Sequence, residues 1–284
     1  MNDNRLSQLS QRFILERLEI LKGTDLASAR IDDLKAMLFD LLSAYTSTTL
    51  LIDETRPIFR ARRHRQDEKE KLLDRVDEVY PKACFIKRLG RANRERTPIF
   101  YFSADKVIAL HELKPNIEEI FSVIECRTRQ GVSPFLVPIG IHELARRHNA
   151  RIGGDFQEPA VRIRAFLGND EDFEKHKLID NFVAAEFLKV VDEGQEHLYK
   201  VTIAIAELLF DFETDMGRID GIAYPSIASE QLNANVALLP EAFHRLYKPV
   251  ACTWTRIEET RPNHGFFVSS REAQSVSNEG EIAW

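Results

Sequence analysis

The chain has little cysteine and no long hydrophobic run, and both absences narrow its class. Its 284 residues include three cysteines, Cys84, Cys126 and Cys252, which lie far apart and form no CxxC pair. This usage is typical of reduced thiols in a cytosolic protein. No run of 18 apolar residues occurs, so no membrane-spanning helix and no membrane partner are expected. Residues 1–5 lack the basic and apolar pattern of a secretory signal, which predicts a cytoplasmic location.

An excess of positive charge is also missing. Lysine and arginine number 39 against 45 acidic residues, for a net charge of −6, which argues against direct nucleic-acid binding. Neither a Walker loop nor a GxGxxG motif occurs, so a Rossmann dinucleotide site is not expected. His142, Glu143 and His148 have the wrong spacing for a zinc-binding HExxH helix, and no metal site is predicted.

What is present suits a globular chain with a sizeable core, because 44% of the residues are hydrophobic and 30% are charged. In the first fifty residues, apolar side chains recur at spacings of three and four, as from Leu6 to Leu21 and from Ile31 to Tyr45. This pattern predicts two amphipathic helices separated near Gly23. We therefore expect a helical hairpin over residues 1–50, which could pack on the main domain or on a partner.

The remaining chain mixes strand and helix patterns without a regular βαβ rhythm, so the fold class predicted is α+β. The main domain is placed at residues 51–268. A polar tail at residues 269–284 is expected to be disordered. Strands are expected at 98–102, 120–126, 221–224, 236–239 and 249–257, and helices at 104–113, 142–190 and 199–212.

Local positive charge in this acidic chain indicates an anionic ligand held at one place. Arginines crowd into residues 56–65 and basic residues recur at 87–96. The first cluster has an alternative interpretation as a solvated ion-pair surface, because Asp67, Glu68 and Glu70 follow it.

Several short motifs share an order that suggests a pocket for an anionic, sugar-containing ligand. They are Phe59-Arg60-Ala61-Arg62, Gly90-Arg91-Ala92-Asn93, Pro98-Ile-Phe-Tyr101-Phe-Ser103, Ala109-Leu-His-Glu112, Asp220-Gly-Ile-Ala-Tyr-Pro-Ser226 and Asn235-Val-Ala-Leu.

In this order and spacing, the motifs resemble the RES-domain family, which takes its name from arginine, glutamate and serine. Arg60, Glu112 and Ser226 fall at the three named positions, and Tyr101 falls at the tyrosine of the family's strand. The resemblance spans roughly residues 55–257. It implies a fold related to ADP-ribosyltransferases, with NAD consumed as a substrate. Many family members are toxins held in check by a helix-turn-helix antitoxin, so such a protein partner is an expectation of the resemblance.

The chain departs from the family pattern at two places. Ala92 stands where the family usually has an aromatic residue, so that side of the pocket is expected to be more open. The stretch between Glu112 and Ser226 is longer than in compact members, which implies an insertion around residues 142–190. The sequence leaves a homo-oligomer open.

These residue types suit cleavage of the bond between nicotinamide and ribose. The leaving group is already cationic, so the barrier lies in an oxocarbenium-like sugar that a carboxylate such as Glu112 can stabilise. An arginine fork grips pyrophosphate with paired bonds, with Arg60 as the first candidate and Arg91 as the second. Tyr101 offers a ring face and a hydroxyl to nicotinamide. Ser226 is expected to orient the ligand, and Asn235 is expected to line the nucleotide site.

Alternatives remain open at this stage. Taken singly, each candidate could be structural: a salt-bridging arginine, an exposed helix glutamate, a core tyrosine or a turn serine. The acceptor could be water, phosphate or a protein, the last of which would make the chain a protein ADP-ribosyltransferase. A non-catalytic module that binds a nucleotide or partner is the third hypothesis.

Overall fold

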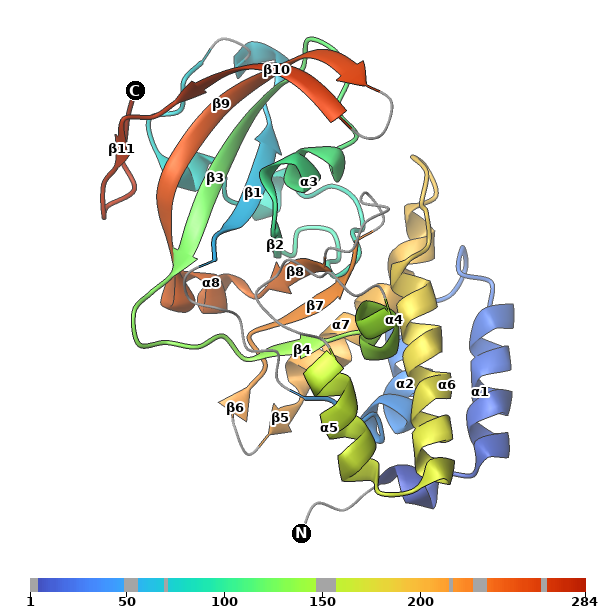
Figure 1. Cartoon of the computed structure of the whole chain (residues 1–284). Helices are drawn as coiled ribbons and strands as arrows, with labels where there is room; N and C mark the ends of the chain where they lie inside the picture. The colour runs from blue at the N-terminus through green and yellow to red at the C-terminus, as the bar shows by residue number, and fades with distance from the viewer. Residues whose placement is uncertain are drawn as a thin grey trace.

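The computed structural model describes residues 5–48, 56–68, 71–146, 157–214, 217–226, 234–261 and 265–284. Figure 1 shows a curved sheet whose β9–β10 end lies at the top of the view and whose β4 end lies among the helices at lower right. The predicted domain boundary at residues 50 and 51 lies outside the described residues. So do residues 147–156 of the predicted insertion.

An eight-stranded sheet in the order β10-β9-β3-β1-β2-β8-β7-β4 forms the centre of the fold. All neighbouring strands are antiparallel except β4 and β7, which are parallel. This mixed sheet confirms the α+β class. The strands are β1 (Ile58–Arg63), β2 (Phe100–Ser103), β3 (Ile120–Thr128), β4 (Leu136–Pro138), β7 (Gly221–Pro225), β8 (Ala234–Leu238), β9 (Tyr247–Arg261) and β10 (Gly265–Glu272). Two short ribbons pair β5 (Glu213–Thr214) with β6 (Gly217–Arg218) and β11 (Ser275–Val276) with β12 (Ile282–Ala283).

Some of the helices begin at side-chain caps. Ser10 accepts a hydrogen bond from the Phe13 amide, and Asn169 accepts one from Asp172 N, each at the start of a helix. The helices are α1 (Gln11–Gly23), α2 (Ile31–Ser43), α3 (Lys106–His111), α4 (Ile141–Arg146), α5 (Gln157–Leu167), α6 (Asp170–Phe187), α7 (Lys200–Asp211) and α8 (Pro240–Leu246). Short 3₁₀ turns occur at η1 (Arg5–Gln8), η2 (Gln66–Glu68), η3 (Val76–Glu78), η4 (Ala83–Phe85) and η5 (Glu196–Tyr199).

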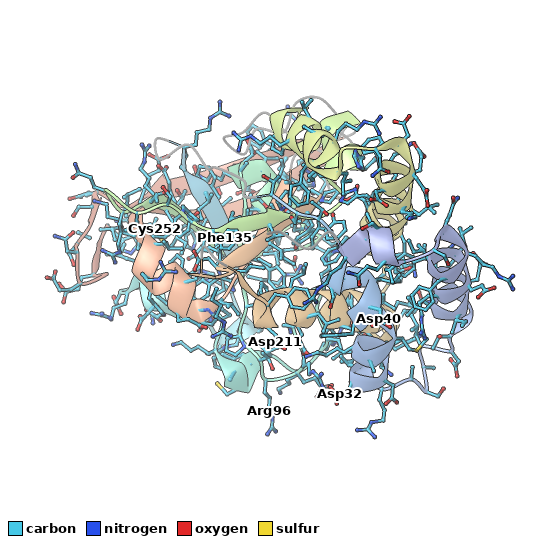
Figure 2. The ribbon with its side chains drawn as sticks, turned by 90° about the horizontal axis from the view of Figure 1, so that it is seen from below. Asp32, Asp40, Arg96, Phe135, Asp211 and Cys252 are labelled. Carbon is cyan, nitrogen blue, oxygen red and sulfur yellow. The ribbon has the colours of Figure 1, made fainter. Side chains whose placement is uncertain are left out.

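The N-terminal helices pack against the rest of the fold: α2 lies on α7 and α1 lies on α6 (Figure 1). Their buried leucines belong to the same hydrophobic cluster as the side chains of β7 and β8. Ion pairs add to this contact, since Lys35 of α2 lies 3.2 Å from Glu207 and 3.1 Å from Asp211 of α7. Figure 2, which views the molecule from below, labels Asp32 of α2 and Asp211 of α7 on the side that faces the viewer.

The C-terminal tail that the sequence predicts as disordered is instead built into strands. β10 pairs with β9 over Gly265–Glu272, and β11 pairs with β12. The indole Nε1 of Trp284 donates a 2.7 Å hydrogen bond to the Leu73 carbonyl, which ties down the last residue. The physical reason for the error is that β10 is an edge strand with mostly exposed side chains, so its polar composition resembles a loop.

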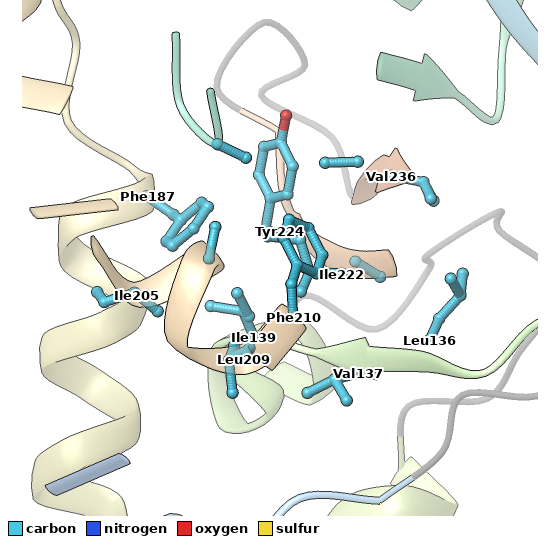
Figure 3. Close-up of a cluster of buried hydrophobic side chains, with 14 of the residues drawn as sticks. Leu136, Val137, Ile139, Phe187, Ile205, Leu209, Phe210, Ile222, Tyr224 and Val236 are labelled. Atoms are coloured by element: carbon cyan, nitrogen blue, oxygen red, sulfur yellow. The ribbon is translucent and has the colours of Figure 1, made fainter. Parts of the chain in front are cut away.

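A tightly packed cluster supports the end of the sheet from which the candidate serine emerges. Figure 3 shows side chains of β4, β7, α6 and α7 meeting there, with Phe187 beside Tyr224. Their ring centroids lie 5.0 Å apart, and both side chains are buried. Packing of this kind fixes β7, and with it the backbone that leads into Ser226.

Candidate functional site

Strand pairing brings the polar side chains of three strands to one face of the sheet. Ser103 of β2 pairs with Asn235 of β8, which pairs in turn with Tyr224 of β7. Because side chains alternate along a strand, Tyr101 shares the face of Ser103. Helix α3 packs on β1 and β2 and ends at Glu112.

Glu112 is held by two buried donors that lie more than a hundred residues further along the chain. Ser226 Oγ donates a 2.7 Å hydrogen bond to Glu112 Oε1, and Asn235 Nδ2 donates one of 2.5 Å to the same oxygen. Ser226 is 1% exposed and Asn235 is 4% exposed. Within the described residues, Oε2 accepts no hydrogen bond. The structure therefore brings together the predicted glutamate, serine and asparagine.

A fourth residue sets the orientation of the asparagine. Ser103 Oγ donates a 2.8 Å hydrogen bond to Asn235 Oδ1. An amide oxygen accepts and an amide nitrogen donates, so this bond turns the Nδ2 group toward Glu112. Ser103 is 3% exposed and was not among the predicted site residues.

The Tyr101 hydroxyl holds the Gly-Arg-Ala-Asn turn, while its side chain lines the inner cavity described below, and contact between Tyr101 and nicotinamide stays a prediction. It donates to Asn93 Oδ1 at 2.8 Å and accepts from Ala92 N at 2.8 Å. Burial raises the pKa of Tyr101, so this phenol stays protonated. The turn requires a glycine, since a Cβ on Gly90 would lie 2.3 Å from Asn93 Oδ1.

The prediction that the pocket is more open at Ala92 is wrong. Ala92 is 3% exposed and packs into the hydrophobic core, and it is not among the residues that line the two cavities described below. Its backbone amide is engaged by Tyr101, which directs the small side chain inward.

Arg91 is positioned by the segment that the sequence treats as an insertion. Its Nη1 and Nη2 donate to the carbonyls of Phe187 and Lys189 at 2.7 and 3.0 Å, at the end of α6. Its guanidinium lies 5.2 Å from the centroid of the Tyr199 ring. Among the described residues Arg91 forms no ion pair, so its positive charge is not neutralised by a carboxylate.

Arg60 is a second arginine without a carboxylate partner in the described part of the chain. Its Nε donates to Val79 O at 3.0 Å and its Nη1 to Tyr101 O at 3.4 Å. Burial lowers the pKa of Arg60 to about 10. The guanidinium lies 5.8 Å from the Phe100 ring centroid, so Arg60 braces the strands beneath the site. Direct contact between Arg60 and a ligand stays a prediction.

Two adjoining cavities open around Glu112. The inner cavity, about 290 Å³, is lined by Arg60, Tyr101, Ser103 and Asn235 among others. The outer cavity, about 480 Å³, is lined by residues that include His111, Lys114, Val190 and Phe266. Arg91, Glu112 and Tyr199 line both cavities and so mark their junction. The predicted carboxylate and one predicted arginine therefore lie where the two cavities adjoin.

The sequence analysis also missed lining residues that contact or face the site. Tyr224 could have been found, because it lies on β7 two residues before Ser226, which directly follows that strand. Ser103 likewise follows Tyr101 by two. Tyr199 and Phe266 carry no local signal, since only the tertiary fold brings them to Glu112.

No group of three or more metal-ligating side chains is found within the residues that the structure describes. His142 Nε2 lies 3.2 Å from His176 Nδ1 in a buried contact between α4 and α6, while His148 lies outside the described residues. In the same part of the chain, no helix has both the length and the apolar character needed to cross a membrane.

Comparison of the chain with models of protein families, with curated proteins and with solved structures finds no match.

Proposed function

We propose that this protein cleaves NAD at the bond between nicotinamide and ribose, with Glu112 as the residue that stabilises the reacting sugar. The observation that carries the proposal is the convergence of Ser226 and Asn235 on one carboxylate oxygen, at the junction of two cavities. The RES-like motifs supply the substrate class, and an ADP-ribosyltransferase-like RES fold is part of the same proposal.

The chemistry needs a fixed negative charge more than it needs an acid. As the glycosidic bond breaks, the pyridinium nitrogen takes the bonding electron pair and leaves as neutral nicotinamide. The ribose carbon becomes electron-poor, and a preorganised carboxylate lowers the energy of that state. Ser226 and Asn235 hold Oε1 of Glu112, so Oε2 is the oxygen we assign to the ribose or to the attacking nucleophile.

The positive charges of the site suit the pyrophosphate of NAD. Arg91 lies at the junction of the cavities and keeps N–H donors beyond the two that it gives to carbonyls. Arg60 is half-buried and has no carboxylate partner among the described residues, so a nearby phosphate would offset part of the cost of desolvating its charge. We assign Arg91 to direct contact with phosphate and Arg60 to support of the wall.

Completion of the reaction needs an acceptor. Water adds to the ribose carbon and releases a proton, which gives ADP-ribose and nicotinamide. Phosphate in its place gives a ribosyl phosphate. A protein side chain as acceptor would make the enzyme an ADP-ribosyltransferase, the alternative that we retain.

NAD labelled in the adenylate half tests this proposal. The purified protein is incubated with the label in buffers with and without phosphate, and in cell extract. We expect free nicotinamide together with label in ADP-ribose or its phosphate ester. Label on protein would favour the transferase alternative. Intact NAD under all three conditions would contradict catalysis and leave the binding-module hypothesis.

A further inference from the structure

The outer cavity adjoins the inner one at Glu112 and brings further residues to a ligand. The inner cavity combines the hydrogen-bonding residues around Glu112 with apolar side chains such as Phe59 and Leu113. The outer cavity adds the aromatic ring of Phe266, the aliphatic side chain of Val190 and the cation of Lys114 to the shared Tyr199 and Arg91. A flat apolar wall with nearby positive charge is the chemistry that binds a nucleobase and its phosphate.

We propose that the outer cavity binds the second nucleoside of a dinucleotide, the half that is not cleaved, and that Phe266 of β10 selects for its base. This proposal rests on the proposed function, because it assumes that the inner cavity takes the ribose at which cleavage occurs. It assigns a role to the C-terminal hairpin β9–β10 that no site motif predicted.

Volume supports two subsites. The inner cavity, at about 290 Å³, is at the lower limit for small-molecule pockets, which run from roughly 300 to 1,000 Å³. A nicotinamide–ribose unit suits that space, but a whole dinucleotide needs more. The outer cavity adds about 480 Å³ directly beyond Glu112. A ligand that spans both would place its pyrophosphate at their junction, beside Arg91.

The position of Phe266 is fixed by a contact with the site helix. Its ring centroid lies 4.1 Å from that of His111, with 33° between the ring planes. His111 directly precedes Glu112, so this contact holds β10 against the end of α3. Phe266 therefore forms a preorganised aromatic wall, which reduces the entropy that base binding would otherwise lose.

Lys114 supplies positive charge to the lining of the outer cavity. Its Nζ lies 3.5 Å from the Val191 carbonyl and 4.0 Å from the Asp192 carboxylate, and its side chain is 70% exposed. Both contacts are long, so the ammonium can turn to a phosphate at small cost. Together with Arg91 it brings two cations to the lining of the outer cavity.

Neighbouring phenylalanines provide a matched pair of variants. Phe266 lines the outer cavity, whereas Phe267 is 54% exposed and its ring lies 5.4 Å from the Arg261 guanidinium. The kcat/KM for NAD and for nicotinamide mononucleotide, which lacks the second nucleoside, is measured in the wild type, Phe266→Ala, Phe266→Trp and Phe267→Ala.

We expect Phe266→Ala to lower kcat/KM for NAD about tenfold and to leave that for the mononucleotide within twofold, because only the dinucleotide has a second base to stack on the ring. Phe266→Trp should keep the preference for the dinucleotide, and Phe267→Ala should behave as the wild type. An equal loss on both substrates in Phe266→Ala would overturn the proposal, because Phe266 would then act only by supporting His111 and Glu112.

Calorimetric titration with AMP separates this proposal from the proposed function. If the protein binds AMP and Phe266→Ala weakens that binding about tenfold while NAD stays intact, the outer subsite stands and the cleavage reaction fails. If NAD is cleaved but the ratio of the two substrates and the affinity for AMP do not change in Phe266→Ala, the reaction stands and the subsite is wrong.

Discussion

Ser103 Oγ donates a 2.8 Å hydrogen bond to Asn235 Oδ1, and this contact decides which end of the asparagine amide meets Glu112. Both residues are buried, so water cannot replace the bond without rearrangement. The carboxylate of Glu112 is thus fixed by a chain of hydrogen bonds that reaches from β2 through β8.

Removal of the Ser103 hydroxyl should affect the position of the Glu112 carboxylate, and so the rate, more than it affects the stability of the protein. We expect Ser103→Ala to lower kcat for NAD cleavage by about 5- to 10-fold with KM changed less than twofold, because one buried hydrogen bond is worth about 1 kcal/mol. Steady-state kinetics with NAD checks this. Ser103→Thr, which keeps the hydroxyl, should restore most of kcat; a Thr variant as slow as the Ala variant would refute a positioning role.

Replacement of Arg91 by lysine should weaken the binding of NAD. A lysine ammonium keeps the charge but lacks the planar fork that reaches the carbonyls of Phe187 and Lys189 together. We expect Arg91→Lys to raise KM for NAD about tenfold, which corresponds to about 1.4 kcal/mol. The matched control is Arg88→Lys on the exposed ion pair with Glu193. Equal KM values in the two variants would contradict contact between Arg91 and the ligand.

Gly90 should tolerate no side chain. A Cβ there would lie 2.3 Å from Asn93 Oδ1 and 3.2 Å from the Tyr101 hydroxyl, so these two hydrogen-bonded side chains must shift. We expect Gly90→Ala to cost about 1–3 kcal/mol and to lower Tm by roughly 2–6 °C in calorimetry. The control is Gly23→Ala in α1, where nothing lies within 4 Å of the new Cβ. If both variants melt at the same temperature, the turn is not fixed in this way.

His142 of α4 and His176 of α6, one half-buried and one fully buried, predict that acid destabilises the protein. His176 Nε2 lies 2.7 Å from the Thr46 carbonyl, and His176 Nδ1 lies 3.2 Å from His142 Nε2. Burial lowers the pKa of both histidines below 6.5. The unfolded chain therefore binds protons more readily. Their stabilising contribution is present above pH 6.5 and is lost as pH falls below it, by up to about 1.4 kcal/mol per pH unit for each histidine.

Urea denaturation at pH 7, 6 and 5 measures this loss. His176→Gln should make the decline in the free energy of unfolding shallower, whereas His197→Gln, outside the contact, should keep the slope of the wild type. A decline of the same steepness in His176→Gln would show that other groups govern the acid sensitivity.

Local hydrophobic pattern was enough to predict α2 and β3. The leucine stripe of α2 matches the period of a helix, and β3 is a short apolar run that is buried on both faces. β4 was missed because its three residues, Leu136–Pro138, are too few to show alternation. The edge strand β10 was missed because exposure on both faces removes the apolar signal.

The candidate site also has parts that the sequence predicted and parts that depend on the tertiary fold. Motif order placed Glu112, Ser226 and Asn235 in one pocket, and the structure brings them within hydrogen-bond distance. The orientation of the Tyr101 hydroxyl was not predictable, because it depends on how the 90–93 turn folds back over the strand. Phe266 lies 154 positions beyond Glu112, and only the pairing of β10 with β9 brings it to the cleft.

The most direct test follows the disappearance of NAD with the purified wild type and Glu112→Gln, after thermal melting has shown that both are folded. Glutamine keeps the shape of glutamate and can still accept from Ser226, but it carries no charge. We predict that the wild type releases nicotinamide and that Glu112→Gln is slower by about 100-fold or more, the scale of a lost electrostatic contact to the transition state. Equal rates in the two proteins, or no nicotinamide from the wild type, would contradict the role given to this carboxylate.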